Sequence, residues 1–257
     1  MEKEKKVETF YDNICSSYGN FEYRVCDAIL EHFLVESLPK NKKLKVLDVG
    51  GGIGRFSKPL LEQGHSVVLT DISQGMLDKA KKLLNNFSNI EFYKESVTNL
   101  KHSDEEFDVV IMMNAILDYC GNHAKAVKEA FRVLKRDGLL IGNVNNRLIY
   151  CRNHELKNED YNLFEQNMKT GDRYIIWGDQ KEGHMSHEFT LNELKETLLT
   201  VGFTIKKISG VFNLLDKYEM ENIKDKKTFI ELQIKYAGYE EYINNSSDFF
   251  FIAEKPQ

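Results

Sequence analysis

The chain has 257 residues, of which 42% are hydrophobic and 29% are charged, so it can bury a core and wholesale disorder is excluded. With only 3 prolines and 16 glycines, collagen-like and low-complexity architectures are excluded as well. Lys and Arg number 35 against 40 Asp and Glu, a net charge of −5, which argues against a broad nucleic-acid-binding surface.

No targeting or membrane segment is visible in the sequence. The N-terminal run is charged with no apolar region behind it, and the apolar stretches 109–117 and 249–253 are far shorter than the ~20 residues of a membrane helix. The cysteines show no CxxC spacing, which favours free thiols: Cys15, Cys26, Cys120 and Cys151. We therefore expect a cytoplasmic protein, without membrane association, that acts as a monomer or homodimer.

Helices and strands alternate through the first half of the chain. Apolar spacing predicts a helix over 7–38, ended by Pro39, and further helices starting near 55–57, at the N-cap Ser73 and over 124–134. Short apolar runs predict five strands: 45–49, 67–70, 90–93, 107–113 and 139–144. The fourth strand should be central, and a turn over 136–138 should precede the fifth. This alternation predicts a doubly wound, mostly parallel α/β sheet.

The regular alternation stops after Asn145. Residues 146–189 are polar and aromatic with no clear period, and then Thr190 opens a helix. Two last strands over 202–208 and 248–254, with a helix near 229–236 between them, complete a seven-stranded sheet. We expect one domain over 1–257, divided as follows: a helical cap (1–40), a cofactor-binding core (41–145), a lid or acceptor insert (146–189) and a C-terminal helix with strands (190–257).

A glycine-rich loop over residues 48–54 follows the first strand and opens a helix. Glycines let a ligand approach the backbone, and a helix N-terminus offers free N–H groups. Asp71 ends the next strand, where a carboxylate can accept two ribose hydroxyls. The dinucleotide pattern G-x-G-x-x-G fails, because its third glycine would fall on Arg55 or Ser57. The loop predicts a nucleoside cofactor that is not a dinucleotide, with a purely structural tight turn as the alternative.

The pattern D-x-G-x-G-x-G over 48–54 resembles motif I of the class I S-adenosylmethionine-dependent methyltransferases. Residues 107–111 are similar to the family's fourth-strand motif, and residues 131–140 to its "RVLKPGG" element. The resemblance implies a Rossmann-like fold, S-adenosylmethionine as cofactor and methyl transfer as the reaction. The nearest likeness is to the tRNA wobble-uridine carboxyl methyltransferases and their relatives, through these segments: 10–14, Tyr23-Arg24, 231–233 and 253–256.

The resemblance also implies which residues hold the cofactor. Gly50, Gly52 and Gly54 would line its methionine and ribose. Asp48 would contact the methionine end, and Asp71 would hold the ribose diol.

Further positions follow from the same resemblance. Ile72 and Val97 would pack on the adenine, and Ser96 stands where many members carry Asp for the adenine amino group. Asn114 would lie beside the sulfonium or only cap its strand, and Arg24 would pair with the cofactor carboxylate or lie on the surface. Two tyrosines would cover the same pocket or pack in the core: Tyr11 and Tyr18.

The candidate catalytic residues are His184 and His187, because an oxygen or nitrogen acceptor often loses a proton and histidine can take it near neutral pH. The resemblance implies that the segment after the fifth strand lies over the acceptor. Surface or helix-capping roles remain open for both histidines. H-x-x-H also fits a metal pair one helical turn apart, but no third ligand is evident, and we expect no metal site.

The predicted function is methyl transfer to an oxygen or nitrogen atom of a small-molecule acceptor. The acidic net charge supports it, as do the large aromatic residues of the insert: Tyr150, Tyr161, Phe164, Tyr174 and Trp177. We expect the insert and the N-terminal helix to form the acceptor pocket together. A tRNA wobble-uridine methyltransferase and a non-catalytic S-adenosylmethionine-binding protein are the alternatives.

Overall fold

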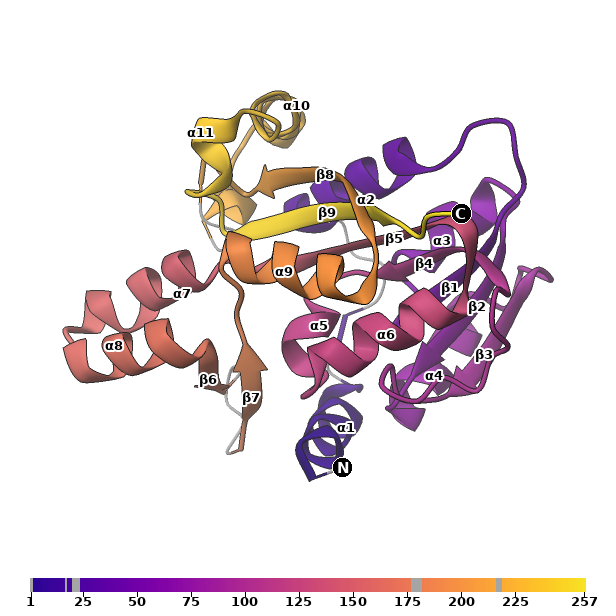
Figure 1. The fold of residues 1–257 in the computed structure, drawn as a ribbon, viewed down its shortest axis with the longest axis horizontal. Coiled ribbons are helices and arrows are strands. Elements are labelled where there is room, and N and C mark those ends of the chain that lie inside the picture. Colours follow the sequence, from indigo (N-terminus) through magenta and orange to yellow (C-terminus); the bar gives the residue numbers. More distant parts are fainter. Residues whose placement is uncertain (1, 17, 20–23, 177–181, 216–218) are drawn as a thin grey trace.

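A computed structural model describes residues 2–16, 18–19, 24–176, 182–215 and 219–257 (Figure 1). One sheet has seven strands in the order β3-β2-β1-β4-β5-β9-β8, in which only β9 runs antiparallel to its neighbours. The strands are β1 (Lys45–Val49), β2 (Ser66–Asp71), β3 (Ile90–Lys94), β4 (Phe107–Met112), β5 (Leu134–Asn145), β8 (Thr204–Val211) and β9 (Asp248–Glu254). The predicted Rossmann-like, mostly parallel seven-stranded sheet is confirmed, with β4 at its centre.

Helices cover both faces of this sheet. They are α2 (Val25–Ser37), α3 (Ser57–Glu62), α4 (Gln74–Leu83) and α10 (Lys226–Tyr236) on one face, and α5 (Ile116–Tyr119), α6 (His123–Val133) and α9 (Leu191–Val201) on the other. The predicted N-caps are confirmed, since Ser73 accepts from the N–H of Met76 and Thr190 from that of Glu193. Pro59 lies in the first turn of α3, where no N–H is needed.

The predicted single helix over 7–38 is wrong, because the structure divides it into α1 (Glu2–Ile14) and α2. Ser16 and Gly19, both poor helix formers, lie between the two. Whereas α2 packs on the sheet against α10, α1 contacts α4 and a strand of the insert, β7 (His184–His187). The expected helical cap therefore consists of two helices that lie in different places.

The predicted turn over 136–138 lies inside a strand. β5 already begins at Leu134, five residues earlier than expected, and its pairing with β4 shifts between Leu134 and Leu139. Asp137 has a φ of +60° at this point, so the turn residues form an irregularity of the strand.

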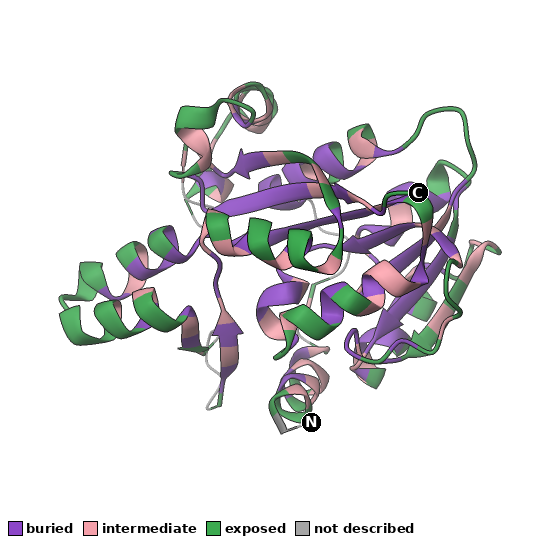
Figure 2. Ribbon diagram, in the orientation of Figure 1, coloured by how far each residue is buried: buried purple, intermediate pink, exposed green. Residues whose placement is uncertain are grey.

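The expectation of an irregular insert over 146–189 is also wrong. This segment forms α7 (Arg147–His154), a 3₁₀ turn (Leu156–Asn158), α8 (Tyr161–Thr170) and the antiparallel hairpin of β6 (Asp172–Ile175) and β7. Helices α7 and α8 project from the sheet, and α8 is largely exposed, whereas half of the residues of α7 are buried (Figures 1 and 2). The insert also holds a buried ion cluster, in which Arg173 of β6 lies 2.9 Å from Glu155 and 3.0 Å from Glu188, so part of its interior is charged and no clear apolar period marks it in the sequence.

The helix expected near 229–236 is present as α10, preceded by a 3₁₀ turn (Met220–Asn222) and followed by α11 (Glu240–Ile243). All four cysteines are free thiols, as expected. Among the described residues, no helix combines the length and apolar character that crossing a membrane requires.

Candidate functional site

The glycine loop between β1 and α3 has a conformation that favours glycine. Gly50 and Gly52 have φ values of +65° and +55°. The N–H of Gly52 donates to Oδ2 of Asp71 (2.9 Å), and that of Gly51 to the carbonyl of Thr70 (3.0 Å). A Cβ atom on Gly52 would meet no described atom within 4 Å. The loop is therefore fixed to the end of β2 and leaves open space above Gly52.

This space belongs to a cavity of about 970 Å³, including its mouth, at the carboxyl ends of β1, β2 and β4. Small-molecule sites in α/β folds usually occupy this edge of the sheet. All but two of the predicted cofactor residues line it: Tyr11, Tyr18, Asp48, Gly50, Gly52, Asp71, Ile72, Ser96, Val97 and Asn114.

Gly54 and Arg24 are absent from the lining. A Cβ on Gly54 would lie 2.4 Å from a methyl group of Leu84, so this glycine allows close packing against the α4 side. The half-exposed side chain of Arg24 lies just before α2, 3.8 Å from Asp27. A different arginine lines the cavity: Arg55, which is 14% exposed and 3.1 Å from Asp27. The sequence prediction missed Arg55, although a cation directly after a glycine loop was an available signal.

Two buried carboxyl groups give the cavity its electrostatic character. Burial raises the pKa of Asp48 to about 7, even though the hydroxyl of Ser57 donates to it (2.6 Å). Burial likewise raises the pKa of Asp71 to about 6, against the opposing effect of N–H donors from Ser73 and Gly52. A ligand that brings hydroxyl donors or positive charge would stabilise both carboxylates.

Helix α1 lies over the cavity and is attached near both of its ends. Glu4 accepts hydrogen bonds from the hydroxyls of Ser96 and Thr98, both 2.6 Å long. Asp12 accepts from the Ser73 hydroxyl (2.5 Å) and the Gly75 N–H (3.1 Å). Glu4 also lines the cavity and brings a carboxylate to Ser96, at the position where the family resemblance implied an acidic residue. No local pattern marks Glu4 in the sequence, because its contacts with Ser96 and Thr98 span 92 and 94 residues.

The end of β4 is strained beside the cavity. Asn114 and Ala115 have φ values of 59° and 62°, a conformation that residues other than glycine rarely adopt. The Asn114 N–H donates to Oδ1 of Asn143 (2.8 Å), whose amide donates in turn to Asp248 (2.9 Å). Asn114 thus ends the strand and lines the cavity at once, so the two roles expected for it are compatible.

His184 and His187 lie on β7, not one helical turn apart, and residues three apart on a strand face opposite sides. His184 is 1% exposed, with its ring centroid 5.0 Å from that of Phe10 and 5.1 Å from that of Tyr119. Its Nδ1 lies 3.2 Å from the Met185 carbonyl, which only accepts, so Nδ1 carries the hydrogen and Nε2 has a free lone pair. Nε2 is buried without a hydrogen-bond partner among the described residues, and burial lowers the pKa of His184.

His187 points away from the cavity, toward α6 and α9. Its Nδ1 lies 2.9 Å from Asp172 and its Nε2 2.9 Å from Glu193. Burial disfavours a charge on this ring, yet the hydrogen bonds to Glu193 and Asp172 raise its pKa. Neither histidine lines the cavity. His184 lies behind two residues that do line it, Tyr11 and Tyr119.

The aromatic residues of the insert do not gather at the cavity. Tyr150 is buried, Tyr161 and Tyr174 are 60% and 56% exposed, and Phe164 is half-buried. None of these four lines the cavity. Two residues named in the sequence analysis lie outside the described part of the chain: Tyr23 and Trp177. Among the described residues, the insert approaches the site through β7, which contacts α1 and α5.

Comparison with known proteins agrees with this geometry. A family model described as a methyltransferase domain matches residues 46–138. The chain is 26% identical to the tRNA 5-carboxymethoxyuridine methyltransferase of Escherichia coli K12, over 98% of this chain and 95% of that protein. It is 29% identical to the ubiquinone/menaquinone biosynthesis C-methyltransferase of Haemophilus ducreyi, over 54% and 57%.

A solved structure shares the fold. An S-adenosylmethionine-dependent methyltransferase of Methanosarcina mazei aligns with a TM-score of 0.64 at 21% identity, over 87% of this chain and 97% of that one. The matched segment 46–138 contains the glycine loop, Asp71 and the strand end at Asn114. Residues 46–138 therefore form a methyltransferase domain, and the matches together support a class I enzyme that uses S-adenosylmethionine as cofactor.

Proposed function

We propose that this methyltransferase acts on an oxygen or nitrogen atom of a small-molecule acceptor, which reaches His184 between Tyr11 and Tyr119. The observation that carries the proposal is the buried, unpartnered Nε2 lone pair of His184. A buried acceptor atom without a donor is unfavourable, and the O–H or N–H group of a substrate would supply that donor.

The cavity lining is compatible with the cofactor. The open space above Gly52 and the buried carboxylate of Asp71 would suit a ribose, Ile72 and Val97 would lie beside the adenine, and Glu4 with Ser96 would lie near its amino group. Asp48, Arg55 and Asn114 surround the opposite end, which suits the charged methionine part. S-adenosylmethionine supplies an electrophilic methyl group there.

The residues of the chain then align the acceptor and receive its proton. As the acceptor oxygen or nitrogen takes the methyl group, the sulfur–methyl bond of the cofactor would break and leave S-adenosylhomocysteine, while the proton of the acceptor atom would pass to Nε2 of His184. The low pKa of His184 keeps the ring neutral and able to accept the proton near neutral pH. His187 takes no part in this proposal, since both of its ring nitrogens face carboxylates on the other side of β7.

A small acceptor is favoured by the way in which the site is enclosed. Helix α1 is held over the cavity by Glu4 and Asp12, and β7 packs against both α1 and α5. The net charge of −5 adds no attraction for a polyanion.

The test uses S-adenosylmethionine with a labelled methyl group, incubated with the full chain and either a small-molecule cell extract or total tRNA. We expect label in a small molecule. His184→Ala should lower turnover by ~10²-fold or more at nearly unchanged cofactor affinity. His32→Ala, at an exposed histidine of α2, is the control and should change neither. Unchanged turnover in His184→Ala would remove this residue from the reaction.

A tRNA acceptor is the second candidate, because the Escherichia coli relative that matches nearly the whole chain acts on tRNA. Label recovered in tRNA, with binding that weakens steeply as salt is raised, would favour this candidate and contradict the small-molecule proposal.

A further inference from the structure

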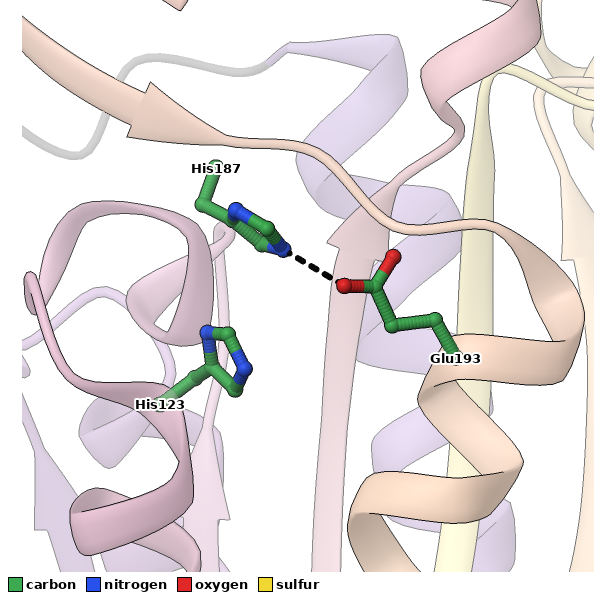
Figure 3. Close-up of side chains that lie close together, drawn as sticks. All are labelled: His123, His187 and Glu193. Atoms are coloured by element: carbon green, nitrogen blue, oxygen red, sulfur yellow. Dashed lines mark hydrogen bonds and ion pairs between the residues drawn. The ribbon is translucent and has the colours of Figure 1, made fainter. Parts of the chain in front are cut away.

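Three elements bring metal-ligating side chains together outside the cofactor cavity (Figure 3). His123 is the first residue of α6, His187 the last residue of β7, and Glu193 lies in the first turn of α9. One donor atom from each lies within 4.8 Å of the other two. None of the three lines the cavity.

We infer that His123, His187 and Glu193 form a binding site for a divalent transition-metal ion such as Zn²⁺. Two imidazoles and one carboxylate are a common set of three protein ligands for such ions, with a fourth position left for water. The site lies apart from the methyl-transfer chemistry and would join the β6–β7 hairpin of the insert to α6 and α9.

The observed distances are close to those that a metal needs. Tetrahedral Zn²⁺ with bonds of about 2.0–2.1 Å holds its ligand atoms about 3.3 Å apart. Nε2 of His187 and Oε1 of Glu193 are 2.9 Å apart, so they need to separate by only a few tenths of an ångström. The ring centroids of His123 and His187 are 4.6 Å apart at an interplanar angle of 31°, so a rotation of the His123 side chain would bring its nitrogen to the ion.

The surroundings orient these ligands. Asp172 faces Nδ1 of His187 at 2.9 Å, which directs Nε2 toward the ion, as carboxylates do beside many metal-bound histidines. Both imidazole rings pack edge-on against the fully buried ring of Phe189, at 5.0 and 5.1 Å. Arg147 forms an ion pair with the other carboxylate oxygen of Glu193, which leaves Oε1 for one bond to the ion.

A metal-free arrangement is the competing explanation. In it, Asp172, His187, Glu193 and Arg147 form a chain of hydrogen bonds that attaches the hairpin to α9 and α7 without an ion. His123 has no place in that chain, so a substitution of His123 separates the two explanations.

In the experiment, Zn²⁺ alone is titrated into the full chain after chelator treatment and dialysis. Calorimetry and the melting temperature both report its binding. We expect one ion per chain and a melting temperature that rises with Zn²⁺. His123→Ala and Glu193→Gln should each weaken binding by at least ~10-fold, and Asp172→Asn by about 10-fold. His32→Ala should bind Zn²⁺ like the wild type.

Co²⁺ identifies the ligand atoms, because a nitrogen and oxygen set gives a d–d spectrum without the charge-transfer band of a cysteine ligand. Loss of that spectrum in His123→Ala, in a variant that melts like metal-free wild type, would support the site. Absence of stoichiometric binding, or equal Zn²⁺ affinity in wild type and His123→Ala, would overturn it. Neither measurement uses methyl transfer, so both are independent of the proposed acceptor.

Discussion

Asp71 has two tasks in the cavity, because its carboxylate accepts N–H groups from Gly52 and Ser73 and faces the place of the ribose. Asp71→Ala should weaken S-adenosylmethionine binding by about 2–3 kcal/mol, since hydrogen bonds to a charged acceptor are lost, and Asp71→Glu should do less harm. The melting temperature should fall as well, because the glycine loop loses its anchor. Calorimetry checks the affinity, with the exposed Asp78→Ala on α4 as the control. Wild-type affinity in Asp71→Ala would mean that the ribose lies elsewhere.

The raised pKa of Asp71 predicts opposite effects of pH on binding and on folding. Its pKa is about 6 in the folded chain, against about 3.9 unfolded, so folding of the free protein favours the protonated form. Its contribution to stability is therefore fully present below about pH 4 and is lost as the pH rises through 6.

Cofactor binding needs the ionised carboxylate of Asp71, so affinity should fall as the pH drops below 6, by up to tenfold per unit. Asp12 also faces this group and adds negative charge that favours its protonation, and Asp48 is a second buried carboxyl group of the cavity with a pKa of about 7. Titrations between pH 5 and 7 check the trend, and Asp71→Asn should reduce it to the part that Asp48 contributes. A wild-type affinity independent of pH in this range would contradict the role of Asp71.

At the scale of elements, the attachment of α1 determines how well the cavity is closed. Asp12→Ala removes the hydrogen bonds to Ser73 and Gly75, and we expect roughly tenfold weaker cofactor binding as α1 loosens. Glu8→Ala on the same helix removes only an exposed ion pair with Lys94, which contributes little, and serves as the matched control. Equal affinities in the two variants, measured by calorimetry, would show that α1 does not close the site.

Elements with a local signal could be predicted from the sequence. The buried run at β4 indicated a central strand, and Ser73 and Thr190 marked helix starts that the structure confirms. The break between α1 and α2 was missed because apolar spacing continues on both sides of Gly19. The insert was misread as irregular because buried charges such as Arg173 replace an apolar stripe within it.

At the scale of the whole molecule, the cofactor side was more predictable than the acceptor side. The loop, Asp71 and Asn114 lie at strand ends, and parallel strands bring their carboxyl ends to one edge. Glu4 and the cluster around His187 depend on contacts between distant segments, which no local pattern reveals.

The central claim is that the cavity above Gly52 binds S-adenosylmethionine, and an equilibrium titration of wild type and two glycine variants tests it most directly. Gly52→Ala places a Cβ in the cavity, at a φ of +55°. Gly202→Ala is the control, because it also places an alanine at a positive φ, +109°, but beyond the end of α9. We predict one bound S-adenosylmethionine per chain, no binding of NAD, at least ~10-fold weaker binding in Gly52→Ala and wild-type affinity in Gly202→Ala. Wild-type affinity in Gly52→Ala, or tighter binding of NAD than of S-adenosylmethionine, would contradict the claim.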